Sequence, residues 1–199
     1  MRNNPPPGHQ TDADRSPGSQ RGRSLATVIG VAVLVAAVDQ QTKLWALWHL
    51  DPHRTLPVLG DLVGLQLAFN RGAAFSLAEG RTWILSVLAA LVIASLLVWA
   101  ATGLRLIIAV GVGCLIGGAA SNLSDRLTRG QNIGEGAVVD MINYADIAIG
   151  NVADIAILVG VVILAVTFSR SPNPRSQNGK DGPPGASDYP TEPRNQEPR

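Results

Sequence analysis

Asp140 and Asp154 are the residues whose type and spacing could perform chemistry. Asp140 lies between apolar pairs in Val138–Ile142, and Asp154 follows 14 residues later, in the first turn of an apolar run that begins at Asn151. Apolar surroundings raise the pKa of a carboxyl group, and two close carboxylates share one proton. One can then act as a base on water while the other donates to a carbonyl oxygen. The pair predicts aspartic peptide hydrolysis, with Asp140 expected on a loop and Asp154 at a helix start.

Two other aspartates compete for membership of this pair. Asp146 ends the segment Asn143–Asp146, which repeats the Asn-x-Ala-Asp form of Asn151–Asp154. A last helix beginning at Asn143 would carry Asp154 about 12 Å deeper into the membrane, where an unpaired charge is costly. Asp125 is followed by an arginine, and a cation keeps it ionised more easily. We therefore predict that neither aspartate replaces Asp140 or Asp154.

The sequence offers no rival catalytic set. It has no Ser–His, Cys–His or His-Glu-x-x-His arrangement, and its histidines, His9, His49 and His53, lack companions at metal-ligand spacing. Cys114 lies in an apolar run without a basic neighbour, so it is expected to pack rather than react. No metal is expected. The net charge is +1 without a basic run, which argues against nucleic-acid binding.

Four apolar segments are expected to position these residues as membrane helices. A bilayer core needs about 20 mostly apolar residues per helix. The segments that meet this requirement are Leu25–Leu50, Thr82–Ala101, Leu106–Ser124 and Asn151–Ser169. Residues 1–23 and 170–199 are rich in Pro, Gly and polar residues, so they are predicted to be disordered cytoplasmic tails around a membrane domain of residues 24–169. The fold class is therefore an all-α membrane protein.

The first span has an alternative interpretation. Its apolar run, Leu25–Val38, follows two arginines and ends in Val-Ala-Ala, which is also the anatomy of a cleaved signal peptide. The sequence continues without a helix breaker as far as Pro52, which favours a retained helix. Retention places Asp39 and Lys43 four residues apart on one helical face.

Positive charge predicts the orientation of the chain. Short flanks with excess Lys and Arg tend to remain cytoplasmic. The flanks at both termini and the link between spans two and three carry Arg15, Arg21, Arg23, Arg105, Arg170, Arg175 and Lys180. Both termini are therefore predicted to be cytoplasmic, and residues 51–81 and 125–150 to face outward. Within the first outward segment, Asp61–Phe69 partly alternates and predicts a small extracytoplasmic β element.

Polar residues gather at the outer ends of the predicted helices. Ionisable groups at membrane depth are costly and mark functional sites by default. The residues at this level are Asp39, Lys43, Asn70, Arg71, Asn122, Asp125, Arg126, Asp140, Asn151 and Asp154. Helix capping is an alternative role for Asn151 and Asp154. For Asp125 and Arg126 the alternative is an interfacial cap where the third span leaves the membrane. Glycines at 111, 113, 117 and 118 are expected to let helices approach closely.

Five segments in order resemble the bacterial lipoprotein signal peptidases, also called signal peptidase II. The family patterns are Asp-Gln-x-x-Lys, Asn-x-Gly-Ala-Ala-Phe, Gly-Gly-Ala-x-Gly-Asn-x-x-Asp-Arg, Val-Val-Asp and Phe-Asn-x-Ala-Asp. The matching segments are Asp39–Lys43, Asn70–Ser76, Gly117–Arg126, Val138–Asp140 and Asn151–Asp154. The resemblance covers about residues 25–168. Ser121 stands for a usual Gly, Met141 and Gly150 for usual Phe residues, and Arg129–Ala137 is a Gly-rich insert.

The resemblance implies a fold, a reaction and residue roles. It implies four transmembrane helices with an extracytoplasmic β cradle in the bacterial cytoplasmic membrane, and an active site at the outer face. The reaction would remove signal peptides from prolipoproteins, cutting before a diacylglyceryl-modified cysteine, without a cofactor. The partners would be these substrates and membrane lipid. Catalysis would fall to Asp140 and Asp154, substrate positioning to Asn70, Asn122, Arg126 and Asn151, and support of the site to Asp39, Lys43 and Asp125.

Two other functions remain as alternatives. A small four-helix transporter would carry its charges near the membrane midplane at broken helices, whereas here they gather at one interface. A non-catalytic membrane scaffold would need neither Asp140 nor Asp154. Transport without peptidase activity would favour the first alternative, and function that survives alanine at both aspartates would favour the second.

Overall fold

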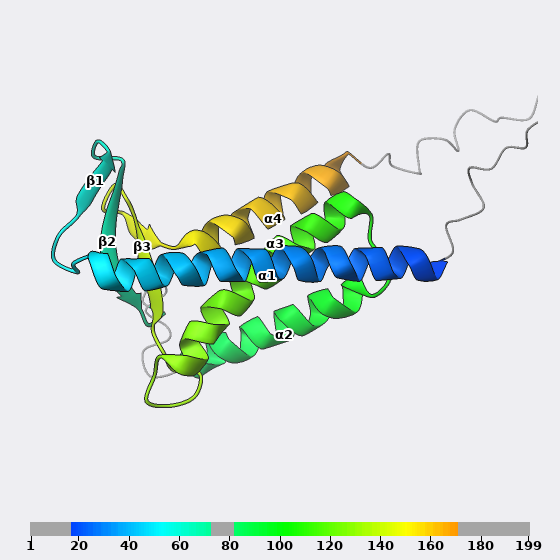
Figure 1. Ribbon diagram of the computed structural model, residues 1–199, viewed down its shortest axis with the longest axis horizontal. Helices are drawn as coiled ribbons and strands as arrows, with labels where there is room; N and C mark the ends of the chain where they lie inside the picture. The colour runs from blue at the N-terminus through cyan, green and yellow to red at the C-terminus, as the bar shows by residue number, and fades with distance from the viewer. Residues whose placement is uncertain (1–16, 73–81, 171–199) are drawn as a thin grey trace, which may run out of the picture. The chain divides into compact units, whose positions relative to one another are not determined.

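The computed structural model describes residues 17–72 and 82–170, which form helices and a small antiparallel sheet (Figure 1). The elements in chain order are α1 (Pro17–His49), β1 (Leu56–Leu59), β2 (Val63–Asn70), α2 (Thr82–Ala100), α3 (Leu106–Thr128), β3 (Val138–Tyr144), β4 (Ala148–Gly150) and α4 (Val152–Ser169). All four helices are long and apolar enough to cross a membrane, which confirms the predicted spans. Helix α1 already includes residues 17–23, which the sequence interpretation had assigned to a tail. Residues 1–16 and 171–199 of the predicted tails lie outside the described residues.

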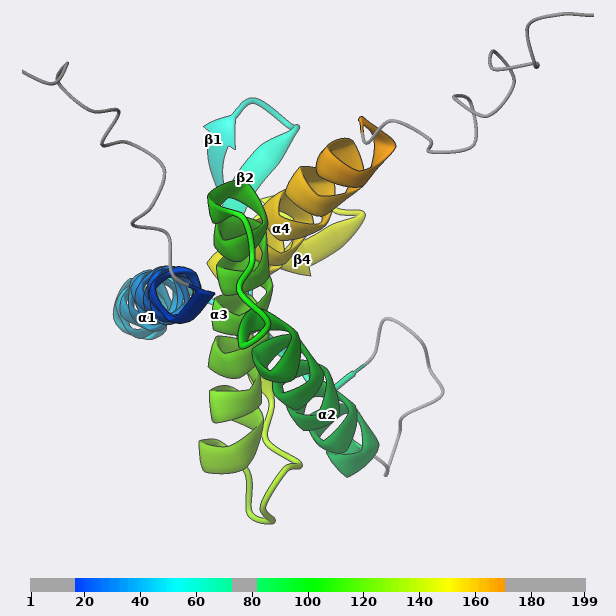
Figure 2. The same cartoon turned by 90° about the vertical axis from the view of Figure 1, so that its right-hand side faces the viewer.

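Helix α3 is the centre of the bundle and packs against the other three helices (Figure 2). Its glycines make this close approach possible, as predicted. A Cβ atom on Gly117 would lie 2.6 Å from the carbonyl oxygen of Ala32 in α1, and one on Gly118 would lie 2.6 Å from that of Ala153 in α4. No side chain fits at either contact, so the backbones of α1 and α4 pack directly against the backbone of α3.

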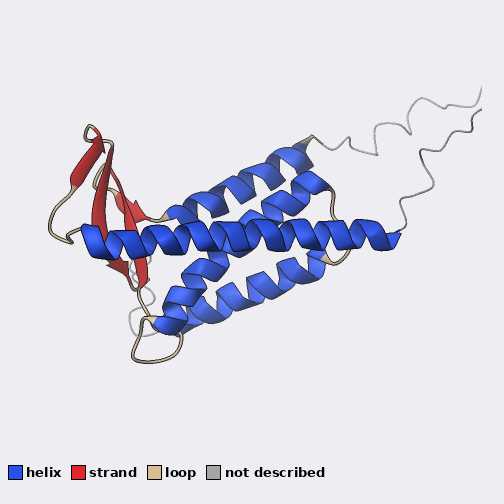
Figure 3. Cartoon of the chain, in the orientation of Figure 1, coloured by secondary structure: helices blue, strands red, loops and turns tan. Residues whose placement is uncertain are grey.

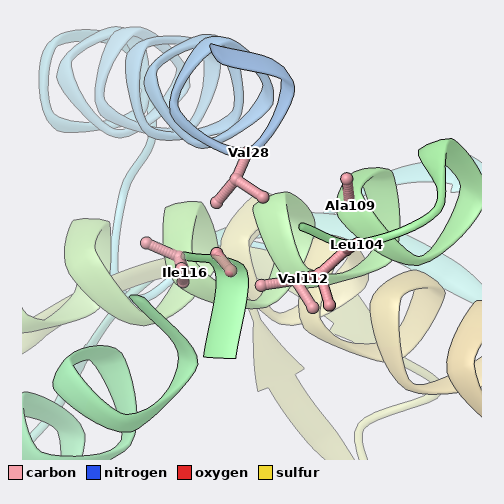
Figure 4. Close-up of a cluster of buried hydrophobic side chains, with 6 residues drawn as sticks. Val28, Leu104, Ala109, Val112 and Ile116 are labelled. Atoms are coloured by element: carbon pink, nitrogen blue, oxygen red, sulfur yellow. The ribbon is translucent and has the colours of Figure 1, made fainter. Parts of the chain in front are cut away.

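An apolar cluster fills the bundle at the end where α1 begins. Val28 of α1 points toward Val112 and Ile116 of α3, close to Ala109 and to Leu104 of the α2–α3 turn (Figure 4). The beginning of α1, the end of α4 and the α2–α3 turn all lie at this end of the bundle (Figure 1). The start of α1 and the end of α4 therefore lie at the same end of the four-helix bundle.

The sheet lies at the opposite end of the bundle (Figure 3). Its order is β1-β2-β3-β4, with each neighbouring pair antiparallel. Strand β2 confirms the predicted β element, whereas β1, β3 and β4 were not predicted. The expectation that Asp140 lies on a loop is wrong, because Asp140 is in the middle of β3 and pairs with Ala68 of β2. The run Val138–Ile142 is too short to identify as a strand without its partner.

The side chains of β3 alternate between two environments. Val139 and Met141 are buried against Ala46 and Leu50 at the end of α1. Successive side chains of a strand point to opposite faces, so Asp140 points to the other face, toward the beginning of α4. One face of β3 thus packs against the end of α1, and Asp140 on the other face points toward the beginning of α4.

Candidate active site

Asn151 joins the two predicted catalytic carboxylates. Its side-chain amide donates to Oδ1 of Asp140 at 2.6 Å, and its backbone N–H donates to Oδ2 of Asp154 at 3.1 Å. Asn151 also caps α4, because its Oδ1 accepts from the backbone N–H of Asp154 at 3.0 Å. One residue therefore fixes the start of α4 and brings together two carboxylates from different elements.

Asn122 of α3 makes the second link between the two carboxylates. Its Nδ2 donates to Oδ1 of Asp154 at 3.1 Å, and its Oδ1 accepts from the side-chain amide of Asn151 at 3.2 Å. The same Oδ1 accepts from Nζ of Lys43 at 2.8 Å. Because an ammonium can only donate, Lys43 fixes the amide orientation of Asn122 and directs its N–H group toward Asp154.

Lys43 is fully buried and uses all three of its N–H donors. Besides Asn122, it contacts Oδ2 of Asp39 at 2.7 Å and Oδ2 of Asp125 at 2.8 Å. Asp39 and Asp125 are also buried. Asp39 and Lys43, which were expected on one helical face, therefore pair with each other, and Lys43 also pairs with Asp125 of α3. The buried ammonium of Lys43 lies between the carboxylates of Asp39 in α1 and Asp125 in α3, so it links the two helices at the level of the site.

Sequence reasoning did not assign three residues that complete this network. Gln40 donates to Oδ1 of Asp125 at 3.1 Å and to Oγ of Ser121 at 3.0 Å, and Ser121 donates to Oδ2 of Asp39 at 2.7 Å. Arg129 donates to Oδ1 of Asp125 at 2.8 Å. The available signal was the four-residue spacing of Asp125 and Arg129 on one helix; Gln40 and Ser121 have partners that are distant in the sequence.

Asp140 is only 2% exposed, and its surroundings favour the neutral carboxyl group. Burial raises the pKa of Asp140 to about 6, and the charge of Asp154 contributes to the increase. The side-chain amides of Asn151 and Asn70 and the ammonium of Lys43 act in the opposite direction. Asp154, in contrast, is exposed at the first turn of α4, where the helix dipole favours an anion. The two carboxyl groups therefore have unlike environments.

The remaining predicted binding residues surround Asp140. Asn70 ends β2, and its backbone pairs with Val138, two residues before Asp140. Its Oδ1 accepts from the backbone N–H of Gly72 at 2.8 Å, and the rest of this motif, from Ala73, lies outside the described residues. Within the described residues, Nη1 of Arg126 is a buried nitrogen without a hydrogen-bond partner. A buried guanidinium N–H group without a partner is available to a ligand.

The two competing aspartates have other partners. Asp146 lies in the turn between β3 and β4, where Ala145 and Asp146 have φ values of 52° and 56°. Consecutive positive φ values are typical of a type I′ hairpin turn, and Asn143 closes the turn with 2.6 Å and 2.9 Å hydrogen bonds to Asp146. Asp125 is held by Lys43 and Arg129. Across residues 17–72 and 82–170, no group of three His, Cys, Asp or Glu side chains could hold a metal ion.

Comparison with known proteins identifies the family. Residues 31–170 match the signal peptidase (SPase) II family. The lipoprotein signal peptidase of Mycobacterium avium (strain 104) is 38% identical over 164 residues, which cover 81% of this chain and 86% of the relative. That of Rhodococcus jostii (strain RHA1) is 37% identical over 154 residues, 77% of each chain. A bacterial membrane enzyme solved by the in meso method superposes with a TM-score of 0.65 at 25% identity, covering 74% of this chain and 95% of its own. The family match and these relatives show that this chain, with its four membrane helices, belongs to the signal peptidase II family and is a membrane peptidase.

Proposed function

We propose that this protein is an aspartic endopeptidase that removes signal peptides from diacylglyceryl-modified prolipoproteins, with Asp140 and Asp154 as the catalytic pair. The observation that carries the catalytic type is the double bridge between the two carboxylates. Asn151 donates to both, and Asn122 donates to Asp154 while accepting from Asn151. The substrate class is that of the relatives, which are named lipoprotein signal peptidases.

The unlike environments of the two carboxyl groups support a division of labour. Asp140 is buried, with its pKa raised to about 6, so it holds the shared proton and donates it to the carbonyl oxygen of the scissile bond. Asp154 is exposed and accepts hydrogen bonds from Asn151 and Asn122. Asp154 therefore removes a proton from the attacking water, and the resulting hydroxyl adds to the carbonyl carbon.

Arg126 and Asn70 are proposed to position the substrate backbone. The buried Nη1 of Arg126 lacks a partner within the described part of the chain. A carbonyl oxygen of an extended substrate segment would satisfy this nitrogen. Asn70 ends the strand beside Asp140, so its amide is placed to bind the same segment. Asn70→Ala is expected to raise KM more than it lowers kcat.

The proposed orientation puts both termini in the cytoplasm and the site at the outer face of the bacterial cytoplasmic membrane. Arg23 and Arg105 lie at one end of the bundle, and the site lies at the other. The positive-inside bias assigns the arginine end to the cytoplasm. The substrate's apolar signal helix would lie in the membrane, with its lipidated cysteine at the level of the site. Retention of α1 stays a prediction that an intact-mass measurement checks.

The experiment incubates the purified protein with a diacylglyceryl-modified prolipoprotein and locates the cut by mass spectrometry. Cleavage before the modified cysteine is expected. Asp140→Asn and Asp154→Asn should each abolish it while the protein still inserts into the membrane. Asp146→Asn is the matched control, because it removes a carboxylate from the neighbouring hairpin turn, and it should retain most activity. Full activity of Asp154→Asn, or a folded but inactive Asp146→Asn, would overturn the assignment of the pair.

A further inference from the structure

A cavity of about 470 Å³ opens at the end of the bundle opposite the catalytic pair. It is lined by the first turns of α1 and by the link that enters α3. The lining residues are Ser19, Gln20, Arg23, Ser24, Thr27, Leu104, Arg105 and Leu106. None of these residues belongs to the site described above, and the cavity has no role in the proposed peptide hydrolysis.

Hydrogen bonds between α1 and the α2–α3 turn build the wall of this cavity. Ser24 is 3% exposed, donates to the carbonyl oxygen of Ala100 at 3.2 Å and accepts from the backbone N–H of Leu104 at 3.0 Å. Gln20 donates to the carbonyl oxygen of Gly103 at 3.4 Å. These bonds hold the first turns of α1, which carry Arg23, against the link that carries Arg105. Both arginines therefore line the same cavity.

Neither arginine forms an ion pair with a carboxylate of residues 17–72 or 82–170. The sequence contains no Asp or Glu from residue 16 to 38, or from residue 82 to 124. Every ion pair among the described residues involves Lys43 or Arg129, at the other end of the bundle. Two guanidinium groups beside a shared cavity therefore leave a positive charge that an anion of matching geometry would neutralise. Phosphate oxygens fit such groups in bidentate pairs.

The entrance to α3 lies beside the same cavity, and the first N–H groups of a helix have no partner within the helix. Arg105 is the N-cap residue and makes no side-chain hydrogen bond that caps the helix. Ser19 also lines the cavity and carries a hydroxyl donor, whereas the hydroxyl of Thr27 donates to the carbonyl oxygen of Arg23 at 2.9 Å. Together with the two guanidinium groups, these donors match the several oxygens of a phosphodiester.

We propose that this cavity binds the phosphate group of an anionic phospholipid in the leaflet opposite the active site. Apolar surface below the arginines favours a lipid over free phosphate. Leu106 borders the cavity and is 71% exposed, and Ile107 next to it is 47% exposed. Both lie in the first turn of a helix that crosses the membrane. Acyl chains would cover these side chains while the phosphate sits between Arg23 and Arg105. Basic pockets between membrane helices on the cytoplasmic side are known to hold anionic headgroups.

The test titrates the purified full chain in non-ionic detergent with phosphatidylglycerol or phosphatidylcholine and counts bound lipid by native mass spectrometry. The wild-type protein is expected to retain phosphatidylglycerol in preference to phosphatidylcholine. Each arginine removed should weaken phosphatidylglycerol binding roughly fivefold, so Arg23→Gln/Arg105→Gln should weaken it roughly 25-fold. No substrate is present, so the outcome is independent of the proposed peptidase activity.

Two matched variants make the result specific. Arg54→Gln/Arg71→Gln removes the same charge from exposed positions at the sheet end and should leave phosphatidylglycerol binding unchanged. Arg105→Gln alone should lose roughly fivefold, and it keeps the proposal testable if the double variant does not fold. Equal loss in the control, or unchanged affinity in Arg105→Gln, would overturn the site. Displacement of the lipid by millimolar inorganic phosphate would overturn the lipid as its ligand.

Discussion

The replacement of Asp140 by Asn is expected to change the stability of the protein in a pH-dependent way. Burial raises the pKa of Asp140 in the folded protein from its ordinary value of 3.8 to about 6. Below about pH 4 the carboxyl group is neutral in both folded and unfolded states, so its titration does not change the free energy of unfolding. Above about pH 6 it is ionised in both states, and the buried charge lowers the free energy of unfolding. The stability contributed by Asp140 therefore falls as the pH rises through this window.

The magnitude follows from the size of the shift. A rise from 3.8 to about 6 is roughly two units, and each unit corresponds to about 1.4 kcal/mol, which gives about 3 kcal/mol. Asp140 is 2% exposed, so solvent screening removes little of this value. Asn keeps the oxygen that accepts from Asn151 at 2.6 Å. Asp140→Asn should therefore be about 3 kcal/mol more stable, relative to wild type, at about pH 8 than at about pH 4.

The measurement is equilibrium unfolding of wild type and Asp140→Asn in one detergent, at intervals from about pH 4 to about pH 8. Only the difference between the two curves is interpreted, because other titrating groups are common to both proteins. Asp61→Asn is the control, since it removes an exposed carboxylate from the turn between β1 and β2. A difference that does not change with pH, or that favours wild type at high pH, would refute the reasoning.

Three further changes test the surroundings of the site. Lys43→Met should cost about 3–5 kcal/mol of unfolding free energy, because it leaves buried carboxylates unpaired; a loss under about 1 kcal/mol would contradict the network. Gly118→Ala should lower the melting temperature, because its Cβ would lie 2.6 Å from the carbonyl oxygen of Ala153; unchanged melting would show that α3 and α4 can separate freely. Asn151→Ala should move the alkaline limb of the kcat/KM profile to higher pH, because it removes the hydrogen bond that lowers the pKa of Asp140; a shift to lower pH would reverse that role.

The sequence was sufficient for the spans and for one strand, because their signals are local. Span length and apolar composition identify a membrane helix without knowledge of its neighbours. Strand β2 was visible through alternation along Asp61–Phe69. Strand β3 was missed because its residues are apolar almost throughout, and a short apolar run does not distinguish strand from loop. It is a strand because β2 pairs with it across a separation of about 70 residues, from Ala68 to Asp140.

The candidate site divides in the same way. Asp39 and Lys43 were identified as partners because a four-residue spacing on a helix brings two side chains together. Gln40 could not be identified by this rule, because its partners Ser121 and Asp125 are 81 and 85 residues away. Ser121 was known only as a departure from the family pattern, in which Gly is usual. Its hydroxyl donates to Asp39 at 2.7 Å, so the substitution adds a hydrogen bond to the network.

Asp39 connects the first helix to the position of the proposed catalytic pair. Its Oδ1 accepts from the backbone N–H of Ala153 at 2.7 Å, in the first turn of α4, and its Oδ2 accepts from Lys43 and Ser121. The first N–H groups of a helix have no partner within the helix, so Asp39 satisfies one of them with a side chain from α1. The same turn carries Asp154. A displacement of α1 would therefore move the start of α4, which carries Asp154, and through Ala46 and Leu50 it would also move β3, which carries Asp140. The close approach of α1 to Gly117 therefore bears on the proposed chemistry as well as on packing, because α1 contacts the elements that carry both carboxyl groups.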